Sequence, residues 1–397
     1  MEPAKLIKSL INAIDIDFSV NSNLILFWAA NNKCPHVIKM LLEDERIDPS
    51  VHNNQLVGWA ARYNHIELLE ALMKDPRVNP AADDNYAIRL AAGNGHINVM
   101  KLLMADMRVD PGAGNNCAIK YAALNGKIEA VKLLLQDDRV DPAAENNRAF
   151  IEAVKNNDAK MMELLLADSR VDPGARNSFA IKYASGNGYD AAVQLLLKDL
   201  RVDPSVDDNL PIRNAIARNY INIVKILLTR VVPCNRVLFT AVECRNWKIV
   251  ELLLEDGRVD PAADNNSVFK YASKWGYTEV IVVLLKDGRA DPTSDDYFAF
   301  TNAVENGYVE LVKLFLADPR VNPNVCGNCA ITWATRRDYV EIVKLLLNDE
   351  RIDPHARDIA IGIASENKRG AVTSFLGIPQ IDAEAFPLFY DLLRTVG

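Results

Sequence analysis

A proline recurs along this chain at a nearly constant interval, and this period constrains the fold more than any other feature. The proline ends a string close to Arg-Val-Asp-Pro, and most neighbouring copies are 31 residues apart. The copies stand at positions 49, 80, 111, 142, 173, 204, 261, 292, 323 and 354. The longer interval between Pro204 and Pro261 is divided by Pro233. Such a period predicts an array of repeats, each of which buries its apolar side against its neighbours.

The period extends beyond these strings, from Phe18 to the Ile-Asp-Ala-Glu segment at 381–384. We therefore divide residues 18–382 into twelve repeats, which start at 18, 49, 80, 111, 142, 173, 204, 233, 261, 292, 323 and 354. Residues 1–17 are predicted to be an N-terminal capping half-repeat and residues 383–397 a C-terminal capping helix. The repeat at Pro233 is short, which predicts a weak point or a change in curvature near residues 229–238.

Each repeat has the pattern of two helices. In residues 80–110, positions 87, 88, 91 and 92 are apolar and share one helical face. Gly95 then interrupts the pattern, and glycine tolerates the positive φ of a tight turn. Residues 97–104 are almost all apolar, as in a helix packed on both sides, and a loop rich in Pro, Asp and Asn follows. The pattern predicts an all-α solenoid of helix, turn, helix and loop.

The segments at 86–104 (YAIRLAAGNGHINVMKLLM) and 117–135 (CAIKYAALNGKIEAVKLLL) resemble the ankyrin repeat. The family's Thr-Pro pair is almost absent, with only Pro211 at the proline position. Each repeat is also shorter than the family's length of about 33 residues, which predicts shortened loops or hairpins. The 31-residue form is similar to ankyrin arrays of protists and of giant viruses that infect amoebae. The resemblance implies a noncatalytic scaffold that binds another protein through the concave face of the solenoid.

Composition narrows the class of partner. The net charge of −8 and the pI near 5.3 argue against nucleic acid and against an anionic membrane, since both need a basic face. No apolar stretch reaches the length of a membrane span. Six cysteines and no secretion signal favour free thiols in a reducing compartment. We expect a monomer in the cytoplasm, or in the host cytoplasm if the source is a virus or an intracellular microbe.

The pair Cys326 and Cys329 has the spacing of a redox motif or of half a zinc site. Aligned on an earlier repeat, however, the two cysteines fall on Gly114 and Cys117, in a loop and at the start of a first helix. The strand that a redox motif needs and the other ligands that zinc needs are both missing. We therefore expect no enzyme activity, no cofactor and no metal, and a thiol redox protein remains an alternative. Another alternative is a substrate adaptor for a ubiquitin ligase or similar complex, which would dock through the tail 383–397.

Positions that recur and positions that vary predict different roles. An Arg three residues before each loop proline follows an Asp two residues earlier, which predicts a ladder of ion pairs within or between repeats. The positions after the core alanine pair vary, and large or charged side chains there are candidates for partner contact. The candidates are Arg62, Tyr63, Lys274, Trp275, Arg336 and Arg337. A row of aromatic residues before the core alanine is expected to be core or partly buried, namely Trp28, Trp59, Tyr121, Tyr183, Tyr271 and Trp333.

Overall fold

The computed structural model describes residues 18–367 and 370–378, which contain 24 helices and no strand. The chain divides into two compact units, residues 1–206 and 207–397. The helices of the first unit are α2 (Phe18–Asn31), α3 (Pro35–Leu42), α4 (Val51–Arg62), α5 (Ile66–Lys74), α6 (Ala82–Asn94), α7 (Ile97–Met104), α8 (Ala113–Leu124), α9 (Ile128–Leu135), α10 (Ala144–Lys155), α11 (Ala159–Leu166), α12 (Ala175–Asn187) and α13 (Asp190–Lys198). Those of the second unit are α14 (Val206–Ala217), α15 (Ile221–Leu228), α16 (Asn235–Glu243), α17 (Trp247–Asp256), α18 (Ala263–Lys274), α19 (Thr278–Asp287), α20 (Ser294–Glu305), α21 (Val309–Ala317), α22 (Val325–Arg336), α23 (Val340–Leu347), α24 (Ala356–Asn367) and α25 (Gly370–Phe375).

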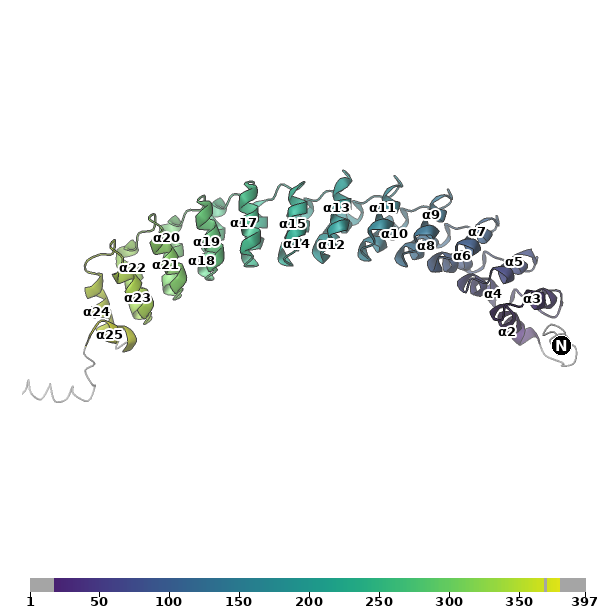
Figure 1. The fold of residues 1–397 in the computed structure, drawn as a ribbon, viewed down its shortest axis with the longest axis horizontal. Helices are drawn as coiled ribbons and strands as arrows, with labels where there is room; N and C mark the ends of the chain where they lie inside the picture. The colour runs from purple at the N-terminus through teal and green to yellow at the C-terminus, as the bar shows by residue number, and fades with distance from the viewer. Residues whose placement is uncertain (1–17, 368–369, 379–397) are drawn as a thin grey trace, which may run out of the picture. The chain divides into compact units, whose positions relative to one another are not determined.

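The helices come in pairs, and Figure 1 shows the pairs of each unit following one another in chain order. We call the even-numbered member of each pair the first helix and the odd-numbered member the second helix. In residues 18–206, first helices pack on first helices and second helices on second helices. The same holds from α16 to α25 in the second unit. The predicted all-α solenoid is therefore confirmed, with the shortened connections present as loops. The predicted caps at 1–17 and 383–397 lie outside the described residues.

The core follows the apolar pattern of each repeat. In the repeat at Pro80, Ala91 and Ala92 of the first helix are fully buried, as are Val99 and Leu103 of the second. The valine of the Arg-Val-Asp-Pro string, Val109, is also fully buried. The paired alanines leave room for neighbouring helices to approach closely, while the branched residues fill the space between the two layers.

An unexpected turn opens most first helices. Asp83, Asp84 and Asn85 at the start of α6 all have left-handed backbone angles, with φ of 54°, 54° and 60°. Equivalent triplets open α4, α8, α10, α12, α14, α18, α20 and α22. Asn, Asp and Gly dominate these triplets because they tolerate this region better than other residues do. The uniform Asp and Asn of the loops therefore encode a left-handed turn.

The last residue of the triplet connects the start of a repeat to the loop at its end. The Oδ1 atom of Asn85 accepts a hydrogen bond from the backbone N–H of Asp110, at the end of the same repeat, at 2.8 Å. Asn54, Asn116, Asn147 and Asn266 make the same bond to the backbone N–H of residues 79, 141, 172 and 291, at 2.7 or 2.8 Å. Asn85, Asn147 and Asn266 are buried, so each bond satisfies polar groups that water reaches poorly.

The predicted ladder of arginines is confirmed. The Nε and Nη2 atoms of Arg108 donate to the two carboxylate oxygens of Asp106, at 3.0 and 2.7 Å. Its Nη1 atom donates to the carbonyl oxygen of Val78 in the preceding repeat, at 3.0 Å. Arg77, Arg139, Arg170, Arg201, Arg258, Arg289, Arg320 and Arg351 repeat both contacts. Each arginine therefore stiffens its own loop and joins it to its neighbour.

The short repeat at Pro233 lacks several of these connections. No left-handed triplet precedes α16, whose N-cap Cys234 is extended with ψ of 163°. Asn209 donates to the carbonyl oxygen of Val232 over 3.4 Å, and its buried Oδ1 atom has no partner in the part of the chain that the structure describes. Arg258 still bonds the carbonyl oxygens of Leu228 and Val231. The interface at residues 229–238 thus keeps the arginine link and loses the asparagine link.

We expect backbone amides in residues 229–238 to exchange with deuterium faster than those of a complete connection. A buried acceptor without a partner costs about 1–3 kcal/mol, which favours local opening. The matched comparison is the loop at Pro292, where Asn266 bonds the N–H of Asp291. Hydrogen exchange read by mass spectrometry measures both segments in one sample. Equal protection of the two loops would show that the short repeat is not a weak point.

Candidate functional site

One position at the end of each first helix carries a structural asparagine in some repeats and a larger side chain in others. In six repeats an asparagine there donates through Nδ2 to a backbone carbonyl oxygen, at 2.7 or 2.8 Å. These residues are Asn32, Asn94, Asn125, Asn156, Asn187 and Asn306, and the bonds of Asn125 and Asn156 reach the preceding repeat. Tyr63, Trp275 and Arg337 occupy the same position in other repeats. The larger side chains thus replace a structural amide with a group that can contact a partner.

Arg62 and Tyr63 lie together at the end of α4. Tyr63 is 53% exposed, and the guanidinium carbon of Arg62 lies 5.6 Å from the centre of the Tyr63 ring. The Tyr63 ring is 5.0 Å from the ring of Trp59, which in turn stacks on His65 at 4.8 Å. His65 is half-buried, and this burial lowers the pKa of its imidazole. The rings of Tyr63, Trp59 and His65 thus form one aromatic cluster.

Lys274 and Trp275 end α18. The Trp275 side chain is 50% exposed, and its ring lies 6.3 Å from Tyr271 of the same helix. The Lys274 ammonium lies 5.9 Å from the centre of the Trp275 ring. The observed exposure shows that Trp275 is a surface residue and is not packed away against the next repeat.

Arg336 and Arg337 end α22 and are both exposed. Arg337 forms a long ion pair of 3.9 Å with Glu305 of the preceding repeat, and its side chain remains 58% exposed. Such an open pair contributes little to stability. Both guanidinium groups are therefore accessible to a partner.

The expected core position of the aromatic row is wrong for three of its members. Trp28, Tyr121 and Trp333 are exposed, by 46%, 43% and 39%. Trp59 and Tyr271 are half-buried because the preceding repeat supplies an aromatic ring, Phe27 at 4.4 Å and Phe239 at 5.1 Å. Tyr183 is also half-buried, beside Phe179 of its own helix. The residue that stands at the position of Phe27 in the preceding repeat therefore decides the exposure. Before Tyr121 and Trp333 this residue is Arg89 and Thr301, which supply no aromatic ring.

Tyr86 belongs to this surface and was not predicted. It is 39% exposed and packs over Gly58, whose missing side chain leaves room for the ring; a Cβ atom there would lie 3.0 Å from it. Two hollows of about 590 and 280 Å³ adjoin at Tyr86, the second also lined by Leu90 and Tyr121. The glycine was the available signal, since other repeats carry larger residues at the position of Gly58.

The cysteine pair lies at the start of α22. Cys326 lies in the left-handed triplet of α22 with φ of 49°, and the Cys329 thiol donates to the Cys326 carbonyl oxygen at 3.0 Å. Burial raises the pKa of Cys329, and the neighbouring Cys326 thiol raises it further, which reduces the reactive thiolate. Residues 18–367 and 370–378 hold no group of three potential metal ligands. Their helices are also too short or too polar to cross a bilayer.

Known protein families, solved structures and curated sequences were compared with this chain. A model of three consecutive ankyrin repeats matches residues 57–147, 150–237 and 290–358. Among solved structures, the ankyrin repeat domain of Bcl-3, described as a unique member of the IkappaB protein family, is similar to this chain at 20% identity. That match has a TM-score of 0.40 and covers 45% of this chain and 89% of the Bcl-3 domain. No curated protein sequence matches significantly. The repeat pattern, the paired helices and the family model together show that the chain belongs to the ankyrin repeat family.

Proposed function

We propose that this protein is a noncatalytic scaffold that binds a partner protein through the exposed ends of its first helices. The observation that carries the proposal is the replacement of the structural asparagine by exposed Tyr63, Trp275 and Arg337. Such aromatic and arginine side chains bring large contact areas and lose few rotamers on binding. The arginine ladder and the asparagine bonds of the loops do not involve these three side chains, which leaves them available to a partner.

The two units offer separate contact surfaces. In residues 18–206 the surface consists of Arg62 and Tyr63 with the neighbouring rings of Trp59, Tyr86 and Tyr121. In residues 207–397 it consists of Lys274, Trp275, Arg336 and Arg337. The cationic groups beside exposed rings favour a partner segment that carries carboxylates and apolar side chains.

We also infer a monomer that works in a reducing compartment. The support is that all six cysteines are free thiols in the structure. No described feature favours the adaptor alternative, whose tail at 383–397 lies outside the described residues.

Affinity capture of the partner with the intact chain, followed by a binding titration, tests the proposal. The variant Trp275→Ala/Arg336→Glu/Arg337→Glu should bind at least about tenfold more weakly, as should Arg62→Glu/Tyr63→Ala if the partner spans the first unit. Lys132→Ala is the matched control, because Lys132 is 50% exposed on the second helix α9. Unchanged thermal unfolding shows that the variants fold. Unchanged affinity in both surface variants would contradict the proposal.

A further inference from the structure

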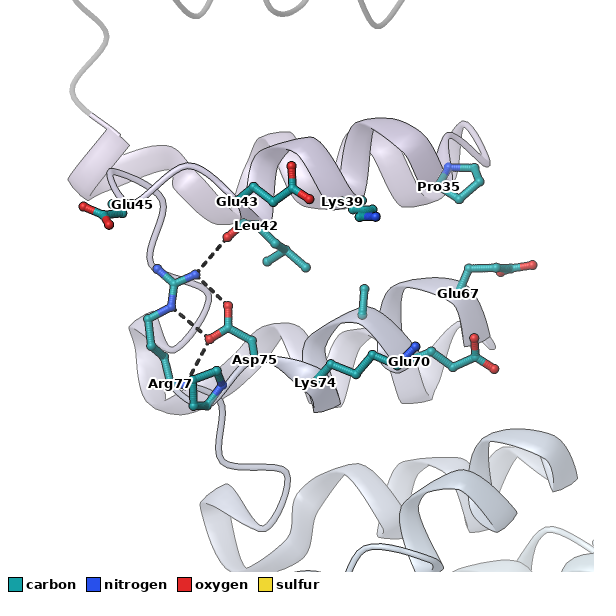
Figure 2. A pocket seen from close by; sticks show the side chains of 12 residues that line it. Pro35, Lys39, Leu42, Glu43, Glu45, Glu67, Glu70, Lys74, Asp75 and Arg77 are labelled. Atoms are coloured by element: carbon teal, nitrogen blue, oxygen red, sulfur yellow. Dashed lines mark hydrogen bonds and ion pairs between the residues drawn. The ribbon is translucent and has the colours of Figure 1, made fainter.

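A groove lies between the second helices α3 and α5 in the first unit. It has a volume of about 1020 Å³, and Figure 2 shows its walls, with Pro35, Lys39 and Leu42 on α3 facing Glu67, Glu70 and Lys74 on α5. At one end, Arg77 donates to the carboxylate of Asp75 and to the carbonyl oxygen of Leu42, at 3.1 Å. These bonds connect the loop after α5 to the end of α3. We call this feature the α3–α5 groove.

The floor of the groove exists because one side chain is small. Ala71 lines the α3–α5 groove at a position where every other repeat carries Met, Leu, Ile, Val or Phe. The equivalent residues are Met40, Leu102, Leu133, Leu164, Leu195, Ile226, Leu252, Val283, Leu314, Leu345 and Phe375. Alanine is thus the one departure from a bulky apolar residue. It leaves a hollow, beside the half-buried Leu42, of the kind that a bulky side chain fills elsewhere.

The rim of the groove carries unpaired carboxylates. Glu43, Glu45, Glu67 and Glu70 line it, and all four are exposed. None of the four makes an ion pair within 4.0 Å with any described residue, whereas Asp75 is paired with Arg77. The two ammonium groups on the rim, Lys39 and Lys74, are outnumbered by these four carboxylates. The groove therefore combines an apolar floor with an acidic rim.

We propose that the α3–α5 groove binds a basic peptide segment of a partner, with one bulky aliphatic side chain seated over Ala71. The Lys or Arg residues on either side of that aliphatic residue face the four glutamates, where opposite charge steers and orients the segment. The apolar floor supplies the affinity that exposed ion pairs alone do not. This site lies on the second helices, so it is separate from the first-helix surface of the proposed function and does not depend on it.

The experiment uses the intact chain and three fluorescein-labelled peptides: Arg-Lys-Leu-Lys-Arg, the same peptide with Ser in place of Leu, and Glu-Asp-Leu-Asp-Glu. Fluorescence anisotropy should show that the basic Leu peptide binds, and at least about tenfold more tightly than either of the others. The variant Ala71→Leu should lose at least about tenfold in affinity, because it fills the hollow with the residue that other repeats carry. Glu67→Gln/Glu70→Gln should weaken binding at low salt and reduce its salt dependence.

Thermal unfolding measures whether Ala71→Leu and Glu67→Gln/Glu70→Gln are folded. If Ala71→Leu does not fold, the peptide affinity of Glu67→Gln/Glu70→Gln tests the proposal. The variant Arg62→Glu/Tyr63→Ala should leave peptide binding unchanged. Absence of binding at about 1 mM peptide, equal affinity for the three peptides, or full affinity in Ala71→Leu would each overturn the proposal. Loss of binding in Arg62→Glu/Tyr63→Ala would do so as well, because it would place the peptide on the first helices.

Discussion

Replacing Asn147 by alanine should destabilise the first unit by about 2–5 kcal/mol. The substitution removes the acceptor for the backbone N–H of Asp172, now bonded at 2.7 Å, and an unsatisfied buried donor costs about 1–3 kcal/mol. It also places alanine at φ of 62°. Alanine has a Cβ atom but no polar side chain that compensates for this backbone conformation, which costs about 1–2 kcal/mol. Urea unfolding followed by circular dichroism measures the loss, and hydrogen exchange at Asp172 locates it.

Two further substitutions at Asn147 separate these causes. Asn147→Gly loses the hydrogen bond and tolerates positive φ, so the difference between the Gly and Ala variants measures the conformational cost. Asn147→Asp keeps an acceptor oxygen and should have the smallest effect of the three. Equal stability of the Ala variant and the original chain would show that the hydrogen bond from Asp172 to Asn147 contributes nothing.

The array should lose stability steeply as the pH falls below about 4. In the folded chain, the hydrogen bonds from the ladder arginine lower the pKa of nine aspartates: Asp44, Asp75, Asp106, Asp137, Asp168, Asp256, Asp287, Asp318 and Asp349. A lowered folded pKa stabilises the fold above the unfolded value of about 3.9, and that contribution disappears as the pH drops through the folded pKa. Urea midpoints measured from pH 7 to pH 2.5 give the profile.

A single-site control assigns part of this profile to the ladder. Asp137→Asn removes the charge and keeps an oxygen for Arg139, whose side chain is 42% exposed. At pH 7 the variant should be less stable by about 1 kcal/mol or less, as expected for a solvent-screened pair. The stability gap should narrow as the pH falls, because protonation of Asp137 removes the charge that distinguishes the original chain from the variant. A gap that does not narrow with falling pH would assign the effect of Asp137 to something other than its charge.

Features that depend on residues close in the sequence could be predicted. The Asp and Arg of each ladder step are two residues apart, so their ion pair follows from the sequence. The tight turn at Gly95 could also be predicted, because it depends on that residue alone. The bond from Arg108 to Val78 spans 30 residues, and that from Asn85 to Asp110 spans 25. Such contacts depend on how the chain folds back on itself within and between repeats. The candidate residues were placed on the surface from their variability, whereas Tyr86 escaped notice because its exposure depends on Gly58 in another repeat.

The sequence by itself determined the period, the two helices of each repeat, the residues of the core and the aspartate–arginine ladder, because these arise from spacing within a few turns of chain. Only the tertiary structure decided that the Asp- and Asn-rich loops form left-handed turns, that their last asparagine bonds the loop at the end of the repeat, and that Trp28, Tyr121 and Trp333 are exposed. It also decided that Ala71 and four exposed glutamates line one groove. Each of these depends on residues that are close in space and distant in sequence.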